Sequence, residues 1–208
     1  MGRWQRIAPK GWGPALAAAF AFALFAWAPL PVRAAAEPLA GIEEVVRLVA
    51  QSHGLPEGIR FRQEVTFRAL LATWRFHSEV EATKDGLKFT IHGAPSFVPD
   101  TLPRDLIDLS RSSSLFELSI AGGASDGTLV LSGSRIAYSG TGPREAIFWV
   151  DPASWTIRRA EAHYPWGTLY VDQEFDWMGD HYLLRRQRAR VSPYGFTLDV
   201  HYVEYRLP

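Results

Sequence analysis

One stretch of the chain matches a catalytic motif. Residues 123–127 (GASDG) fit the G-x-S-x-G pattern of a serine nucleophile elbow. That chemistry needs a strand before the serine and a helix after it, so that the serine hydroxyl is exposed at the helix N-terminus. Here both flanks, Leu115–Ile120 and Gly127–Ser132, read as strands, and Asp126-Gly127 is a common hairpin dipeptide. The spacing therefore predicts a β-hairpin, and no catalytic residue is assigned to it.

The six histidines do not form an evident ligand set. His163, His181 and His201 fall on successive predicted strands, so they can meet only across a sheet. His201 and Glu204 would converge on a helix, but a separation of three residues puts them on opposite faces of a strand. Zinc sites need three or four convergent ligands. We therefore expect no metal site and no cofactor.

Charged residues are also explained by strand pairing. One predicted strand carries an acidic face and the next carries a basic one. These faces consist of Asp172, Glu174 and Asp176, and of Arg186, Arg188 and Arg190. Opposite charges on neighbouring strands attract, so pairing is favoured over an anion-binding site. With no nucleophile, metal set or paired carboxylates, the sequence does not indicate an enzyme.

The first 36 residues have the pattern of a targeting segment. Three basic residues within the first ten positions precede an uncharged apolar run, Ala15–Ala28, and small residues follow at positions 34–36. This order predicts a signal peptide cleaved near Ala36 and a periplasmic protein. An uncleaved anchor is the alternative, but the run falls short of the roughly 20 apolar residues that span a bilayer.

Charge and cysteine content exclude several partners and covalent attachments. Four of the 22 basic residues and none of the 22 acidic ones lie in the leader, so the mature chain has a formal charge of about −4. This balance argues against nucleic acid as a partner and against electrostatic binding to anionic lipid. The chain has no cysteine, which excludes disulfides and a lipoprotein anchor. Residues 37–208 are expected to form a single domain.

Apolar periodicity predicts one helix followed by a mainly β (α+β) fold. Ile42, Val45 and Val49 recur at helical spacing within Leu39–Ser52. From Ile59 onward apolar and polar residues alternate, and we count about ten strands. The last five are 146–150, 155–163, 168–177, 181–192 and 196–207, joined by tight turns.

The predicted sheet has more apolar surface than one helix can cover. Either the sheet curls closed on itself or it leaves a cavity, and the sequence leaves both open. The candidate cavity-lining residues are Phe61, Val65, Phe67, Trp74, Phe76, Val80, Phe89, Leu118, Trp149, Val171, Phe175 and Trp177. The proline-bearing insert Gly93–Ser114 reads as a loop or a short helical lid. The candidate lid residues are Leu102, Leu106 and Leu109.

The order of these elements resembles the LolA-like superfamily of periplasmic carriers that sort outer-membrane lipoproteins. The closest local similarity is the V-D-P turn within residues 148–155, followed by Arg158, Arg159 and a strand led by Gly167. The resemblance implies an unclosed, strongly curved antiparallel β half-barrel with an apolar cavity for acyl chains under a helical lid. It also implies a cavity-facing arginine, for which Arg62 and Arg68 are candidates. The family's aromatic-proline segment has only a loose counterpart in residues 93–97.

Two functions follow from this reading. The first is a monomeric periplasmic carrier whose partners are lipoprotein or lipid acyl chains, with an inner- or outer-membrane protein as a further partner. The second is a non-transporting interaction or sensor module of the same fold. A carrier should have a lidded cavity, whereas an interaction module should fill that space with side chains and expose an apolar patch or an open sheet edge.

Overall fold

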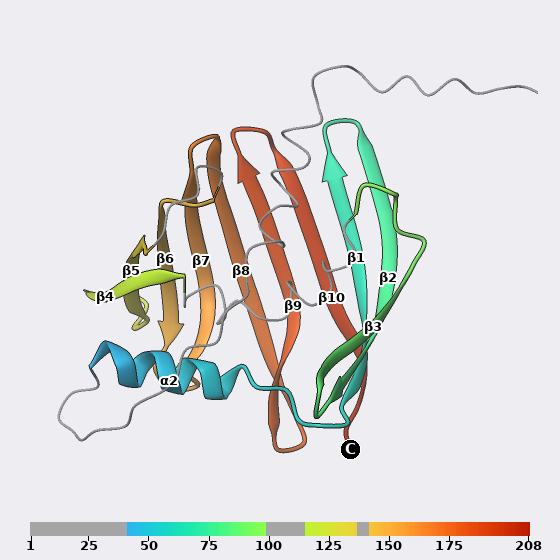
Figure 1. The fold of residues 1–208 in the computed structure, drawn as a ribbon, viewed down its shortest axis with the longest axis horizontal. Helices are drawn as coiled ribbons and strands as arrows, with labels where there is room; N and C mark the ends of the chain where they lie inside the picture. Colours follow the sequence, from blue (N-terminus) through green and yellow to red (C-terminus); the bar gives the residue numbers. More distant parts are fainter. Residues whose placement is uncertain (1–40, 99–114, 137–141) are drawn as a thin grey trace, which may run out of the picture.

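The computed structural model describes residues 41–98, 115–136 and 142–208 (Figure 1). These residues form one ten-stranded antiparallel sheet with the order β3-β2-β1-β10-β9-β8-β7-β6-β5-β4. The two edge strands, β3 and β4, do not pair with each other, so the sheet is an open half-barrel. This arrangement confirms the predicted fold class and answers the question of closure that the sequence had left open.

The helix and strands have the following bounds. The helix is α2 (Ile42–Ser52). The strands are β1 (Arg60–Ala69), β2 (Ala72–Thr83), β3 (Gly86–His92), β4 (Phe116–Gly123), β5 (Leu129–Arg135), β6 (Glu145–Asp151), β7 (Thr156–Tyr164), β8 (Gly167–Met178), β9 (His181–Ser192) and β10 (Phe196–Arg206). The candidate lid residues Leu102, Leu106 and Leu109 lie outside the described residues.

Two meanders meet in the middle of the sheet. Strands β1 to β3 form an N-terminal meander, and β4 to β10 form a C-terminal one. They join where β1 pairs with β10, with Val65 opposite Val200. Asp85-Gly86 turns β2 into β3, as the dipeptide predicts, and Gly86 takes the positive φ that such a turn requires.

The face of the sheet on which α2 packs, called the inner face below, carries the core. Burial alternates along β1, so that Phe61, Val65 and Phe67 are buried on this face. Strand alternation produces the same pattern in the neighbouring strands. The apolar stripe of α2 places Val45 and Val49 in the same core. Figure 1 shows the helix crossing the sheet near one end of β6, β7 and β8.

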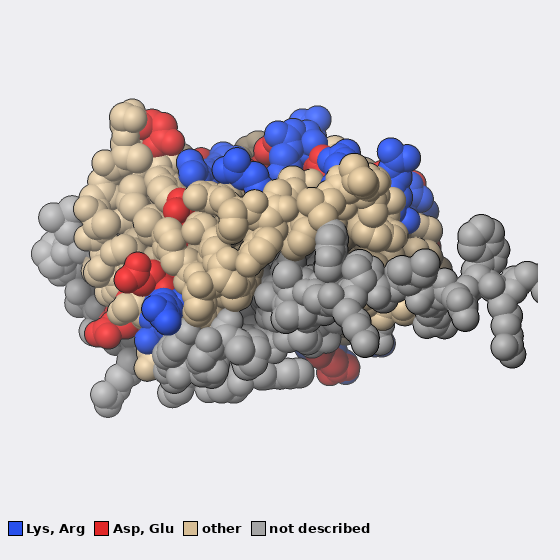
Figure 2. Space-filling view, turned by 90° about the horizontal axis from the view of Figure 1, so that it is seen from above, with Lys and Arg blue, Asp and Glu red and all other residues tan. Residues whose placement is uncertain are grey.

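The opposite, outer face is charged. Lys and Arg side chains gather along one long side of the molecule in Figure 2. The predicted cross-strand pairing is found in part, since Arg188 lies 3.7 Å from Glu174. Arg186 instead donates two hydrogen bonds to Asp199 on β10, at 2.9 and 2.7 Å. The outer face is therefore held by ion pairs in both directions from β9.

Asp199 should make stability depend on pH in the acid range. The bidentate hydrogen bonds from Arg186 lower the pKa of Asp199 below its ordinary value of 3.8. A lowered folded pKa means that this stabilisation is complete above about pH 4 and is lost as pH falls through the folded pKa. Asp199→Asn should cost about 1 kcal/mol at pH 7, and the deficit should shrink by pH 3.

Urea unfolding of both proteins at pH 7 and pH 3 measures this effect. Asp172→Asn is the matched control, because Asp172 is an exposed carboxylate on the same outer face. If Asp199→Asn lowered the free energy of unfolding by the same amount at both pH values, the stabilisation would not depend on ionisation of Asp199.

Candidate ligand-binding face

A small apolar hollow lies on the inner face between four strands. It is lined from β4, β6, β7 and β8 by Phe116, Ala146, Phe148, Ala160, Glu161, Ala162, Leu169 and Val171. The three alanines leave space that larger side chains would fill. The volume open to a water-sized sphere is about 10 Å³, enough for about one water molecule. An acyl chain can occupy this hollow only if it widens.

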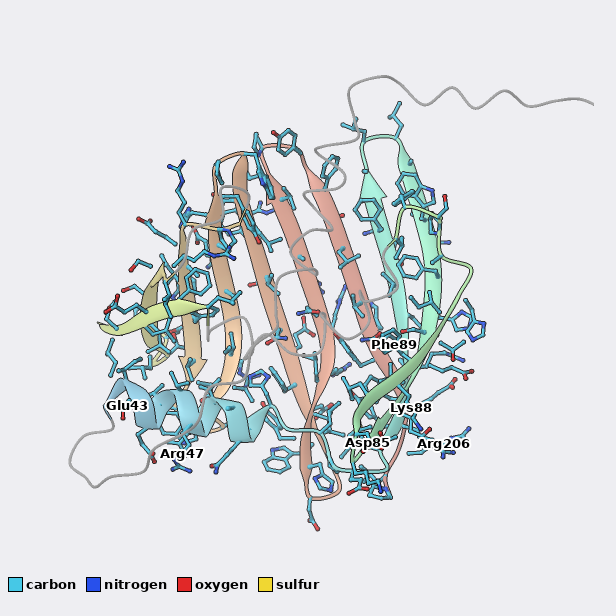
Figure 3. The ribbon with its side chains drawn as sticks, in the orientation of Figure 1. Glu43, Arg47, Asp85, Lys88, Phe89 and Arg206 are labelled. Carbon is cyan, nitrogen blue, oxygen red and sulfur yellow. The ribbon has the colours of Figure 1, made fainter. Side chains whose placement is uncertain are left out.

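Most of the predicted lining residues share the inner face. The buried ones are Phe61, Val65, Phe67, Phe76, Val80 and Val171. The partly buried ones that pack against the same core are Trp74, Phe89, Leu118 and Phe175. Phe89 comes from β3, far from the α2 residues Glu43 and Arg47 (Figure 3). Only Val171 of this set lines the hollow itself.

Two predicted lining residues lie elsewhere. Trp149 is on the outer face, where the Arg159 guanidinium lies 4.8 Å from its ring centroid. The reason is strand alternation, since Phe148 and Val150 take the inner positions on either side of it. Trp177 is 66% exposed near the end of β8 and packs on Tyr182, with 5.0 Å between ring centroids.

The two arginines suggested by the family resemblance also lie on the outer face. Arg62 forms ion pairs with Glu64 at 2.8 Å and with Glu204 at 2.7 Å. Arg68 is exposed. Both alternate with the buried apolar residues of β1, so neither points into the core.

A row of buried polar residues crosses the inner face, and the sequence analysis did not identify it. Its members are Ser78, Gln63, Tyr202, Gln187 and Gln173, on β2, β1, β10, β9 and β8 in spatial order. Register places Gln63 opposite both Ser78 and Tyr202, and it places Gln187 opposite Gln173. Burial raises the pKa of the Tyr202 hydroxyl well above its ordinary value, so the phenol stays neutral. The five residues are called the polar row below.

A signal for this row was present in the sequence. Gln63 lies between Phe61 and Val65 with the same parity, and Gln173 lies between Val171 and Phe175. Period-two alternation alone therefore predicts that both amides face inward. The row was missed because only the apolar members of each stripe were considered.

Aromatic rings line the end of the sheet where the β1–β2, β7–β8 and β9–β10 turns lie together (Figure 1). Successive ring contacts join Trp74 to Phe67, Phe67 to Phe196, Phe196 to Tyr194, Tyr194 to Trp166 and Trp166 to Tyr164, with centroids 4.5–6.4 Å apart. The β1–β2 turn adds Leu70 and Leu71, which are 65% and 105% exposed. We call this end of the molecule the aromatic rim.

The G-x-S-x-G stretch forms a hairpin, as its flanking residues predict. It connects the antiparallel strands β4 and β5. The Asp126 carboxylate accepts hydrogen bonds from the Thr128 hydroxyl at 2.7 Å and the Thr128 backbone N–H at 3.0 Å, and these bonds lower its pKa. Asp126 thus orders its own turn, and no helix follows Ser125.

Residues 41–98, 115–136 and 142–208 contain neither a cluster of metal ligands nor a membrane-spanning helix. Within these ranges, no three His, Asp or Glu side chains come together as metal ligands would. No helix there has the length and apolar content needed to cross a membrane.

Comparison with solved structures shows a LolA-like fold. A DUF1329 family protein from Desulfovibrio piger superposes with a TM-score of 0.60 at 10% identity, covering 81% of this chain and 93% of that one. A LolA superfamily protein from Nitrosomonas europaea gives 0.56 at 11% identity, covering 82% and 94%. A putative outer membrane lipoprotein-sorting protein domain from Vibrio parahaemolyticus gives 0.53 at 9% identity, covering 77% and 91%.

Sequence comparison adds nothing to this result. No protein-family model matches the chain, and no curated protein matches it. The similarity is therefore one of fold.

Proposed function

We propose that this protein is a periplasmic carrier that binds the acyl chains of lipoproteins or lipids on the inner face of its sheet. The observation that carries the proposal is an unclosed sheet whose inner face, apart from the polar row, carries one apolar cluster from β2 across to β4. Each methylene buried there contributes about 0.8 kcal/mol, so an acyl chain needs few specific contacts to bind. The LolA-like fold supports this reading.

The hollow is the expected starting point for an acyl chain. Its wall is apolar, and α2 contacts two of its strands, β4 and β7. The C-terminal end of the helix is fixed to the start of β7. There the Ser52 hydroxyl donates to the Trp155 carbonyl at 2.6 Å, and His53 Nε2 accepts from the Ile157 N–H at 3.0 Å. This end of the helix is therefore anchored to the strand that supplies Ala160 and Ala162 to the hollow.

Native mass spectrometry of the mature protein, isolated from its own periplasm, tests the proposal. The expected result is a co-purifying species that bears an acyl chain and is recovered by lipid extraction. A protein that is free of ligand and also takes up no added fluorescent fatty acid would contradict the carrier function.

Filling the hollow should block acyl binding. Ala162 is a buried residue in its wall, and leucine at this position adds three carbon atoms to a space that holds about one water. Ala162→Leu should weaken binding of a dansylated C11 fatty acid at least about tenfold, because displaced methylenes each forfeit about 0.8 kcal/mol. Fluorescence titration of the mature protein measures the change.

The control for this variant is Ala82→Leu. Ala82 is buried to a similar extent but lies in a separate cluster with Ile59 and Leu183. Overpacking should lower the free energy of unfolding of both variants by about 1–3 kcal/mol. Ala162→Leu and Ala82→Leu should therefore differ in acyl binding but not in stability. Equal affinities for the two variants would show that the hollow is not where the chain binds.

A second function, a non-transporting interaction module, is favoured by one feature. The aromatic rim exposes Leu70, Leu71 and Tyr194 at one end of the sheet, and the exposed ring of Phe97 packs on Trp74 of this rim with 5.3 Å between centroids. Exposed apolar side chains grouped in this way are typical of a contact surface. If the protein takes up no acyl probe but loses a protein partner when Leu70 and Leu71 are replaced by serine, the interaction module is the better description.

A further inference from the structure

Gln173 is a buried amide with both hydrogen-bonding atoms unused. Its side chain is 4% exposed, and neither Oε1 nor Nε2 has a hydrogen-bond partner among residues 41–98, 115–136 and 142–208. A buried polar atom without a partner is rare and costs free energy in the folded state. Leucine or methionine would fill the same space without that cost, so the amide calls for an explanation other than packing.

The rest of the polar row does not satisfy Gln173. Gln63 Oε1 accepts from the Ser78 hydroxyl at 2.6 Å. Gln187, directly opposite Gln173, has its Oε1 engaged by the Tyr202 hydroxyl at 3.2 Å. The row therefore ends on β8 with an amide that is available to another molecule.

Gln173 lies next to the hollow along β8. Val171, two residues earlier on the same face of β8, forms part of the wall of the hollow. Two residues of a strand span roughly 7 Å. A chain lying in the hollow can thus present a polar group to Gln173 at the boundary between the apolar wall and the polar row.

We propose that Gln173 binds the acyl carbonyl group of the ligand, with Nε2 donating a hydrogen bond to the carbonyl oxygen. This inference rests on the proposed function, since it names the part of the acyl ligand that is recognised. An ester, an amide and a carboxylic acid all share the acyl carbonyl. A protonated carboxylic acid would also donate its O–H to Oε1 and so satisfy both atoms of the amide.

Two lipids that differ only in this carbonyl test the proposal. The probes are palmitoyl lysophosphatidylcholine and its O-hexadecyl ether analogue, titrated against the mature protein. The wild type should bind the acyl form about two- to tenfold more tightly, as expected for one hydrogen bond. Gln173→Met should abolish that difference. Palmitic acid as a third probe separates a free carboxyl group from an ester as the preferred source of the carbonyl.

The Tm of the ligand-free protein separates a binding role for Gln173 from a structural one. If Gln173 stabilised the fold, Gln173→Met would lower the Tm. Gln173→Met removes an unsatisfied amide at nearly constant volume, so the Tm should rise by about 2–8 °C. The matched control, Gln187→Met, loses the bond from Tyr202 and should lower the Tm.

The possible results distinguish failure of the proposed role of Gln173 from failure of the proposed carrier function. Equal binding of the two lysolipids by the wild type, a difference that survives in Gln173→Met, or a lower Tm for Gln173→Met would each overturn the role of Gln173 while leaving the carrier function intact. If the wild type binds none of the three probes, the proposed function fails, and this inference fails with it.

Discussion

Replacing Phe148 by alanine is expected to lower the free energy of unfolding by about 3–5 kcal/mol. The Phe148 side chain is 3% exposed, lies opposite Leu131 and Ala160 in the sheet, and packs edge-to-face on Phe116 at 6.1 Å. Its removal loses buried apolar area and enlarges a hollow that three alanines already leave incompletely filled. Urea unfolding at pH 7 measures the loss.

Ile147→Ala is the control for Phe148→Ala. Ile147 is the adjacent residue on β6, but it points to the outer face and is only partly buried, so the cost should stay below that of Phe148→Ala. The enlarged hollow should also bind a small apolar molecule such as benzene, and benzene should raise the Tm of Phe148→Ala more than that of the wild type. Similar losses for the two variants would mean that Phe148 is not part of a tightly packed wall.

The inner face, on which ligand binding is proposed, is also the hydrophobic core of the described fold. Six of the twelve predicted lining residues are buried in one apolar cluster, so in the ligand-free fold they stabilise the sheet. A ligand must therefore displace contacts of the protein before it forms its own. The small side chains of Ala146, Ala160 and Ala162 lower that cost locally, because fewer contacts have to be broken there.

Most strands could be predicted because each combines alternation with a turn of known chemistry. The V-D-P turn illustrates this. The backbone N–H of Ala153 donates to the Asp151 carboxylate at 2.9 Å, and that of Trp155 donates to the Asp151 carbonyl at 2.7 Å, so β6 ends where the sequence indicates. Register followed from these turns, since a slip of one residue would expose every buried side chain.

Bulges limit what alternation can predict. The β8–β9 register shifts between Glu174 and Phe175, and the β6–β7 register shifts between Trp149 and Val150. A bulge adds one residue to one strand and changes the phase beyond it. The extra residues are Arg185 on β9 and Arg158 on β7, so the phase changes on those two strands, and the adjacent residues Leu183 and Leu184 are both buried. On β6 the alternation is unbroken and places Trp149 on the outer face, and Trp177 is exposed near the end of β8.

Gly167→Ala is the second substitution with a large expected effect, at least about 3 kcal/mol. Gly167 begins β8 after the β7–β8 turn, with φ at +153°. A Cβ atom at this position would lie 2.1 Å from the carbonyl oxygen of Ser192 on β9. That oxygen belongs to the backbone of a paired strand, where Thr168 lies opposite Ser192, so it cannot move without disturbing the β8–β9 ladder.

Gly179→Ala separates steric collision from backbone conformation. Gly179 also has a positive φ, at +62°, but a Cβ atom there would meet only the tip of the Leu207 side chain at 3.3 Å. Its cost should be about 1 kcal/mol, the usual penalty for alanine in the left-handed region. Urea unfolding of both variants, together with amide exchange along β8 and β9, measures the difference. If Gly167→Ala were no more destabilising than Gly179→Ala, the close approach of β8 to Ser192 would not be a constraint on this fold.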